Sequence, residues 1–204
     1  MAEESKMRIF LVRHGQTDWN VQDKAQYTRA VPLNKTGKEQ AINLSKQFKD
    51  VQLTHVYASP TLRTRQTAHA ISQAHNIKVI DLPNFVERNP GTLTGLTTVE
   101  IRKQIPDIDK QRELQGIDWR PPGNGETIRE LITRVIHAWK TVLEEHNPND
   151  CILIVTHAID VKCIVHYLHG GKPEDIFHTK SPENAEIVEI EYDGKQCKIL
   201  DKSL

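Results

Sequence analysis

The sequence predicts an α/β fold: a three-layer α/β/α sandwich with a mainly parallel central sheet and an antiparallel edge. Three observations lead to this class. Short apolar segments alternate with helix-like segments, and the two clearest, residues 7–12 and 151–155, are predominantly apolar. Strands of this kind are typical of parallel sheets that helices cover on both faces. A hairpin signal at residues 187–200 predicts the antiparallel edge.

The first half of the chain predicts strands and helices in alternation. The segment Thr36–Glu39 has the pattern of a capping box, which marks the start of a helix. Ser59 and Pro60 predict another start, because serine is a common N-cap and proline is favoured at the first helical position. The expected elements are a strand at 7–12, a helix from 36 to 48, a strand at 55–58, a helix from 59 to about 75 and a strand near 78–82.

The second half repeats this alternation. Thr97–Glu100 and Thr127–Glu130 are two more capping boxes, and a long amphipathic segment follows the second. The Pro/Gly-rich stretch at 120–125 is short, so we interpret it as a loop and expect a single domain over residues 1–204. The expected elements are helices that start at 97 and 127, a strand at 151–155, a helix at 159–168, and a hairpin of strands 187–192 and 196–200.

Composition and charge exclude several classes of partner. The chain has 204 residues, with 27 Lys plus Arg against 27 Asp plus Glu, so its formal net charge is zero. A general nucleic-acid binder or a polybasic membrane-surface protein normally carries a basic excess, so we expect no nucleic-acid or membrane partner. The acidic start lacks an apolar signal core, and the three cysteines form no C-x-x-C pair. These features predict a cytoplasmic protein.

Five side chains suited to chemistry follow the predicted strands. Arg13 and His14 come directly after the first strand, and His157 comes directly after the strand of the second half. Arg63 lies in the first turn of a predicted helix, and Glu87 lies in the loop after another strand. Ligands of mainly parallel sheets bind beyond the carboxyl ends of the strands. The sequence therefore predicts that these side chains share one cleft.

This set of residue types suits a phosphate ester. Guanidinium groups bind phosphate oxygens in pairs, and a neutral imidazole such as that of His14 can attack phosphorus. A carboxylic acid such as Glu87 can protonate the leaving oxygen and later activate water. The second imidazole, His157, can bind the oxygens on which charge accumulates. Because these side chains supply the positive charge that other sites take from Mg²⁺, we expect no metal and no other cofactor.

Several ordered motifs point to one family. Leu11–Thr17 with Asn20 matches the pattern L-x-R-H-G-[EQ]-[ST]-x-x-N. Matching segments follow in the family's order at Leu33–Ala41, Ser59–Ala68, Glu87–Gly95, Gly125–Thr127 and Thr156–His157. Over about residues 7 to 170, the chain resembles the histidine phosphatase superfamily, also called phosphoglycerate-mutase-like.

The resemblance implies a role for each matching residue. His14 would be the nucleophile that becomes phosphohistidine, and Glu87 would be the proton donor and acceptor. Arg13, Arg63 and His157 would form the phosphate pocket, with Asn20 as a further contact. The chain departs from the family pattern around the pocket wall, at Thr64, Leu93–Thr94, Ala158 and Lys162.

We therefore expect a metal-independent phosphomonoesterase that acts on a small phosphorylated metabolite. One alternative is a cofactor-dependent phosphoglycerate mutase, because the sequence at Arg88 and Gly91–Leu96 resembles that of such mutases. The short interval before Gly125–Thr127 and the absence of an Arg-Arg pair favour hydrolysis. A second alternative is a non-catalytic module that binds a phosphorylated ligand on the same fold. The metabolite and the oligomeric state are not predicted; residues 21–32 and 88–123 are expected to form the selective rim.

Overall fold

The computed structural model of the protein describes residues 6–200, which form one six-stranded sheet with the order β3-β2-β4-β1-β5-β6. Four strands are parallel, and the last two pair antiparallel at one edge. This arrangement confirms the predicted fold class. The strands are β1 (Met7–Arg13), β2 (His55–Ala58), β3 (Val79–Asp81), β4 (Cys151–Thr156), β5 (Ile187–Tyr192) and β6 (Cys197–Ile199).

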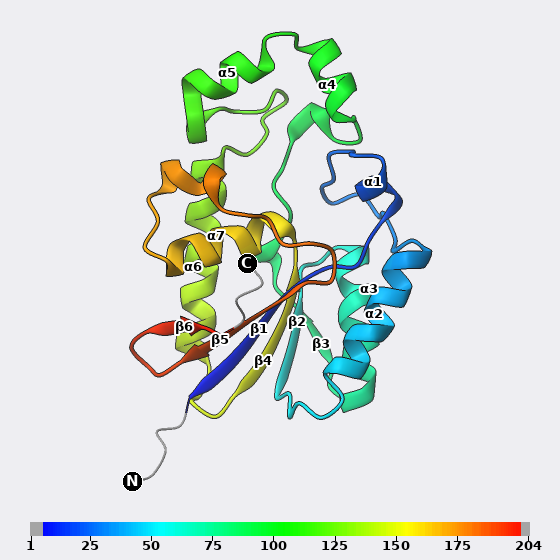
Figure 1. Ribbon diagram of the computed structural model, residues 1–204, viewed down its shortest axis with the longest axis vertical. Coiled ribbons are helices and arrows are strands. Elements are labelled where there is room, and N and C mark those ends of the chain that lie inside the picture. The colour runs from blue at the N-terminus through cyan, green and yellow to red at the C-terminus, as the bar shows by residue number, and fades with distance from the viewer. Residues whose placement is uncertain (1–5, 201–204) are drawn as a thin grey trace.

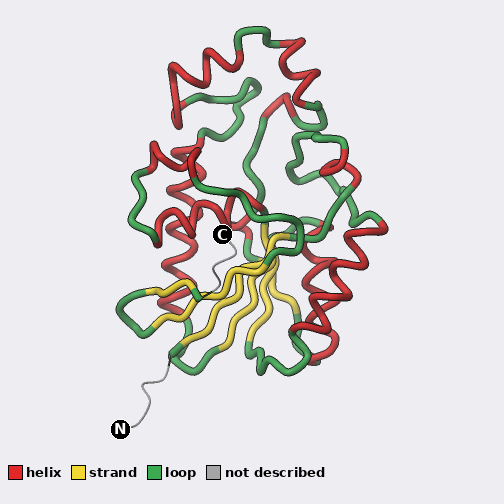
Figure 2. Tube along the Cα trace, viewed as in Figure 1, coloured by secondary structure: helices red, strands yellow, loops and turns green. Residues whose placement is uncertain are grey.

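Helices cover both faces of the sheet, so the molecule has three layers (Figures 1 and 2). Helices α2 and α3 lie on one face, and α6 and α7 lie on the other. Two short helices, α4 and α5, lie beyond the C-terminal ends of the parallel strands. The bounds are α1 (Asp18–Val21), α2 (Lys35–Gln47), α3 (Leu62–Ser72), α4 (Thr98–Gln104), α5 (Ile108–Gln115), α6 (Ile128–Glu145) and α7 (Ala158–Leu168).

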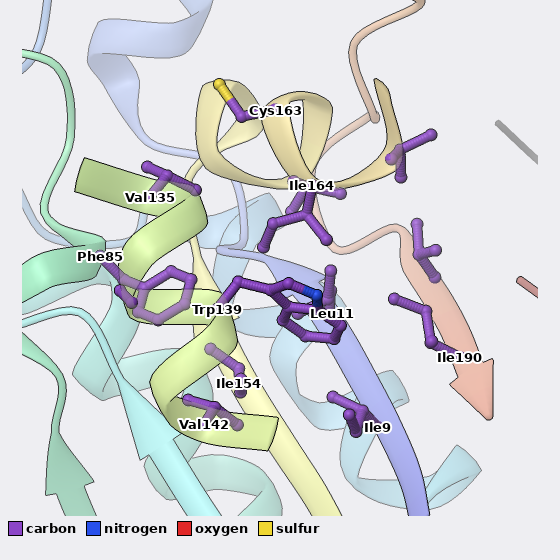
Figure 3. Close-up of a cluster of buried hydrophobic side chains, with 14 of the residues drawn as sticks. Ile9, Leu11, Phe85, Val135, Trp139, Val142, Ile154, Cys163, Ile164 and Ile190 are labelled. Atoms are coloured by element: carbon purple, nitrogen blue, oxygen red, sulfur yellow. The ribbon is translucent and has the colours of Figure 1, made fainter. Parts of the chain in front are cut away.

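Alternate residues of each central strand pack into different cores. In β1, Ile9 and Leu11 face α6 and α7, where Trp139 lies fully buried among them (Figure 3). Phe10 and Val12 of the same strand face the opposite layer. Because both sets are apolar, β1 is buried on both sides, as its composition predicts. The second core also contains Leu44 and Phe48 of the α2 region, Ile71 of α3, and Val56, Leu153 and Val155 of the sheet.

Residues 88–123, which lie beyond the sheet, form a lobe with a small core of its own. Leu93, Ile101, Ile108 and Trp119 are buried together there, apart from the two sheet cores. The expected helix at 97 is confirmed as α4, whereas α5 and the short α1 carry no signal that our sequence analysis used. Within residues 6–200, no helix combines the length and apolar character needed to cross a bilayer.

Two of the expected helix starts are wrong. Asn34, not Thr36, caps α2: its side chain accepts a hydrogen bond from the Gly37 backbone N–H at 2.8 Å. Thr61, not Ser59, holds the N-cap position of α3, and the Ser59 hydroxyl contacts His157 instead. For α2, Asn34 is better placed than Thr36 to accept from the helix start. For α3, the hydroxyl of Ser59 has a tertiary partner and does not cap the helix. The capping boxes at Thr97 and Thr127 are confirmed.

The loop after β1 lies directly against the first turn of α2. A Cβ atom on Gly15 would lie 2.6 Å from the carbonyl oxygen of Gly37, and one on Gly37 would lie 2.0 Å from the carbonyl oxygen of Gln16. Backbone atoms cannot yield to such a contact without moving the loop. Both glycines are therefore required by close approach, which explains the glycine that follows His14.

Replacing Gly37 with alanine should disturb both stability and the position of His14. The new methyl group overlaps the Gln16 carbonyl, and we expect Gly37→Ala to lower the free energy of unfolding by about 1–3 kcal/mol. Urea denaturation measures this. Asn43→Ala, an exposed change on the same helix, is the control and should stay within about 0.5 kcal/mol. Equal unfolding midpoints for the two variants would contradict the close contact.

Candidate active site

Four of the predicted site residues meet at the C-terminal end of the parallel strands. The guanidinium of Arg63 lies at the centre: its Nε donates to Nε2 of His14 at 3.2 Å, and its Nη2 lies 3.2 Å from Nδ1 of His157. Glu87 approaches from a third side, with Oε2 3.8 Å from Arg63 Nη2 and 3.4 Å from His157 Nδ1. Arg63 and His157 have no exposed surface, and His14 is 2% exposed.

The strand register explains why the two histidines are neighbours. β1 and β4 are adjacent and parallel, with Arg13 opposite Thr156. The next residue on each strand is a histidine, so His14 and His157 leave the sheet side by side, with ring centroids 5.4 Å apart. The backbone N–H of His14 still donates to the Thr156 carbonyl at 3.0 Å, which continues the sheet pairing into the site.

Hydrogen-bond partners define the tautomer of each ring. Nδ1 of His14 lies 2.8 Å from the Gly15 carbonyl, which can only accept, so Nδ1 carries the proton and Nε2 keeps a lone pair. Nδ1 of His157 faces an Arg63 N–H, so its proton lies on Nε2, which donates to the Ser59 hydroxyl at 2.8 Å. Both imidazoles therefore present a lone pair toward Arg63.

Burial and charge keep these imidazoles neutral. Burial lowers the pKa of His14 well below its usual range, and the positive charges of Arg63 and Arg13 lower it further. The pKa of His157 is lowered in the same way, first by burial and then by Arg63. Glu87 shows the opposite shift: burial raises its pKa, although the charge of Arg63 opposes the rise. The site thus holds neutral bases beside a carboxyl that retains its proton more readily than usual.

The structure places Arg13 and Asn20 at the edge of this group. Nη1 of Arg13 donates to the Pro182 carbonyl at 2.8 Å, whereas its Nε is buried without a partner. Its charge acts on His14, so it belongs to the same electrostatic site. Thr17 caps α1, and Asn20 at the third helical position completes the capping box, with its Oδ1 accepting from the Thr17 N–H at 3.0 Å. No hydrogen bond between Asn20 and the side chains of the central group occurs within residues 6–200, so a phosphate contact through Asn20 stays a prediction.

Several supporting groups were given no role from the sequence, although Ser59 and Thr67 lie in a segment that matches the family pattern. Thr67 Oγ1 accepts from the Gly15 N–H at 3.1 Å, and the Tyr27 carbonyl accepts from Arg63 Nη1 at 3.1 Å. Asn184 Nδ2 donates to the His14 carbonyl at 3.0 Å. Ser59 contacts the His157 ring, although its place before proline predicted a helix cap. These partners come from distant parts of the chain, so only the fold reveals them.

A cavity of about 490 Å³ adjoins Glu87 and gives room for the rest of a substrate. Residues from both expected rim segments line it, including Tyr27, Asn89 and Arg120. A second cavity, also about 490 Å³, is lined by Arg88, Arg112 and Trp119. The two consecutive residues Glu87 and Arg88 therefore line different cavities.

The arrangement favours an oxyanion over a cation. One ligand atom from each of His14, Glu87 and His157 lies within 4.8 Å of the others, which is close enough to surround a metal ion. However, Arg63 places N–H groups at nitrogen atoms of both rings. A metal ion would meet the positive guanidinium there, whereas a phosphate group could accept hydrogen bonds from it.

Comparison with known proteins decides the family. The family model described as "Histidine phosphatase superfamily (branch 1)" matches residues 9–203. The chain belongs to this superfamily. The sequence-based expectation of a phosphatase of this superfamily is thereby confirmed.

The relatives of this histidine phosphatase carry two kinds of name. The "Uncharacterized phosphatase PhoE" of Bacillus subtilis is 31% identical over 196 residues, which cover 96% of this chain and 94% of the relative. The "Probable phosphoglycerate mutase GpmB" of Escherichia coli is 29% identical over 167 residues, 80% of this chain and 75% of the relative. Among solved structures, Bacillus stearothermophilus YhfR has a TM-score of 0.87 at 25% identity and covers 96% of each chain.

Removing the charge of Arg63 should raise the pKa of His14. The guanidinium disfavours protonation of the ring, so we expect Arg63→Gln to move the His14 pKa upward, toward its ordinary value, while burial still holds it below. NMR titration of the ¹⁵N-labelled imidazole measures the shift. Arg65→Gln, two residues along α3 and paired with the exposed Asp81, is the control and should leave the His14 titration unchanged. An unchanged pKa in Arg63→Gln would contradict this electrostatic coupling.

Proposed function

We propose that this protein is a metal-independent phosphomonoesterase that hydrolyses a small phosphorylated metabolite through a phosphohistidine on His14. One observation carries the proposal: the imidazole of His14 is neutral, and its Nε2 lone pair accepts a hydrogen bond from Arg63. A nucleophile is thus combined with a phosphate-binding cation. The zero net charge of the chain supports a small anionic substrate and no nucleic-acid partner.

In the first step, the phosphate group of the substrate binds against Arg13, Arg63 and His157; His157 donates from Nδ1 after its proton moves there from Nε2, and the Ser59 hydroxyl then donates to Nε2. The Arg63 N–H that now donates to His14 turns to a phosphate oxygen, which frees the lone pair. Nε2 of His14 then attacks phosphorus, and the bond from phosphorus to the ester oxygen breaks. Glu87 gives its proton to the leaving alcohol, which the raised pKa of Glu87 favours. The departing group lies in the cavity beside Glu87.

In the second step, water replaces the alcohol. The Glu87 carboxylate accepts a proton from water as the oxygen attacks phosphorus, and the bond from phosphorus to His14 Nε2 breaks. Inorganic phosphate leaves, and both Glu87 and His14 return to their initial protonation states. One carboxyl group therefore serves both steps, and Arg63 stabilises the charge on the transferred group in each.

Hydrolysis is favoured over a mutase reaction by the charge pairing of the cavity beside Glu87. A mutase of this family holds a bisphosphate, which requires cationic groups for the second phosphate. The two arginines that line this cavity are engaged by carboxylates: Arg134 binds Glu126 at 2.9 Å, and Arg120 binds Glu130 at 2.5 Å. A non-catalytic module would have no need of a carboxyl group with a raised pKa beside the neutral His14.

Two further expectations remain part of this proposal. A single domain over residues 1–204 is supported by the continuous sheet and by the lobe that covers its end. A cytoplasmic location is supported by the free cysteines Cys151, Cys163 and Cys197, none of which forms a disulfide within the described part of the chain.

The reaction should proceed through acid-labile phosphate on His14. Incubation with ³²P-labelled p-nitrophenyl phosphate and rapid quenching should trap label on the wild type and none on His14→Ala, whose phosphate release should fall to background. EDTA should leave the rate unchanged.

The same enzyme, given 3-phosphoglycerate with a trace of 2,3-bisphosphoglycerate, should release phosphate. Formation of 2-phosphoglycerate faster than phosphate release would overturn hydrolysis in favour of the mutase.

The loss of rate that follows removal of the Glu87 proton should depend on the leaving group. Glu87→Gln should slow hydrolysis of an alkyl phosphate by about 100-fold or more, because a poor leaving group needs general-acid assistance. With p-nitrophenyl phosphate we expect less than about tenfold loss in the phosphorylation step, since that leaving group departs as an anion. Single-turnover kinetics on both substrates measure this. Glu126→Gln, which lines the same cavity, is the control; equal losses for both substrates in Glu87→Gln would remove Glu87 as the acid.

A further inference from the structure

One buried carboxyl group beside the site has no part in the reaction described above. Asp160 lies in the first turn of α7, three residues after His157, and has no exposed surface. Its Oδ1 atom has no hydrogen-bond partner, and no ion pair to Asp160 occurs within residues 6–200. The nearby Arg134 binds Glu126 with both arms of its guanidinium instead. A carboxylate in such surroundings would be costly, so its state needs an explanation.

The hydroxyl of Thr156 supplies that explanation by proton counting. Thr156 Oγ1 lies 3.0 Å from the Phe85 carbonyl oxygen and 2.5 Å from Asp160 Oδ2. A hydroxyl has one proton to donate, and a backbone carbonyl can only accept. If Thr156 donates to Phe85, the second contact requires a proton on Asp160. The chain of donors then runs from Asp160 to Thr156 to Phe85, and every contact has its proton.

The charges around Asp160 agree with a protonated group. Burial is the largest cause and raises its pKa well above the usual range; Glu87 and Glu126 raise it further whenever they are ionised, against the opposing effects of Thr156 and Arg134. The other titratable groups that face it are Cys163 on its own helix and Arg63 on α3. A neutral Asp160 adds no negative charge beside Glu87, whose proton is needed for the leaving group.

The ends of this donor chain connect two parts of the active site. Thr156 immediately precedes His157, and Phe85 is two residues before Glu87, with its side chain fully buried. A hydrogen bond from Thr156 to Phe85 therefore fixes the loop that carries Glu87 against the strand that carries His157. Beyond that attachment, Glu87 Oε2 and His157 Nδ1 lie 3.4 Å apart.

We propose that Asp160 is a positioning residue which, as a neutral carboxylic acid, donates to Thr156 and so directs the Thr156 hydroxyl to Phe85, holding Glu87 in place as the general acid. This inference rests on the proposed function only for its catalytic consequence. The protonation of Asp160 is a separate claim, which can be measured without any substrate.

Infrared spectroscopy tests the protonation directly. At neutral pH, the wild type should show the carbonyl stretch of a buried, protonated carboxylic acid, and this band should disappear in Asp160→Asn. Glu87→Gln identifies any band that belongs to Glu87. Absence of a band that depends on Asp160 would overturn the proposal, whatever the enzymatic activity proves to be.

Kinetics test the positioning role. Thr156→Val removes the hydroxyl but keeps the branched shape, so we expect about tenfold loss of the single-turnover phosphorylation rate on an alkyl phosphate and less than about threefold loss on p-nitrophenyl phosphate. Thr156→Ser, which keeps the hydroxyl, should restore the wild-type ratio of the two rates. Asp160→Asn, whose amide can still donate to Thr156, should stay within about threefold of the wild type on both substrates.

The ratio of the two rates separates positioning from damage to the fold. A variant that merely lost folded protein would lose activity on both substrates equally, so an equal loss in Thr156→Val would contradict the proposal. A large loss on both substrates in Asp160→Asn would contradict it as well, because that variant keeps the shape and the donor. If the wild type released no phosphate, the proposed function would fail while the infrared result on Asp160 stood.

Discussion

The site is organised around the buried positive charge of Arg63. A guanidinium with no exposed surface has lost its hydration, and the nearest carboxylate oxygen, on Glu87, is 3.8 Å away. Its N–H groups are instead satisfied by neutral acceptors: two imidazoles and the Tyr27 carbonyl. Charge-assisted hydrogen bonds to an anion are stronger than those to neutral groups. Each nitrogen of Arg63 thus has a hydrogen-bond partner, but none of these partners is an anion, and a phosphate dianion would supply the missing negative charge.

The fold positions these side chains before a substrate binds. Parallel pairing of β1 with β4 brings two histidines together through register alone, and the contact of Gly15 with Gly37 fixes the loop that carries one of them. The layers of α2 with α3 and of α6 with α7 keep the sheet rigid beneath. Side chains held on strand ends over a packed sheet need little reorganisation when a substrate binds, and preorganised groups contribute most to catalysis.

Sequence reasoning reached the fold class and the grouping of His14, Arg63, Glu87 and His157, because apolar periodicity and strand ends are local signals. Predictions from sequence failed for side chains that have both a possible local partner and a possible tertiary partner. Ser59 could cap a helix or hold a histidine, and only the fold shows that it contacts His157. Asp160 lies in the first turn of a helix, where acidic residues are ordinary, and only packing shows that it is buried.

The lobe of residues 88–123 encloses an apolar cluster that is separate from the two sheet cores. The lobe is nevertheless tied to the rest of the molecule, because Ile117 belongs to the same sheet core as Trp139 and the Gly95 N–H donates to the Ala25 carbonyl at 2.8 Å. Part of the wall beside the active site is packed on a cluster distinct from the sheet that positions the histidines. Such a division lets selection alter specificity within the lobe, and protein engineers who exchange its loops should keep Ile117 and the contact with Ala25 so that the chemistry is preserved.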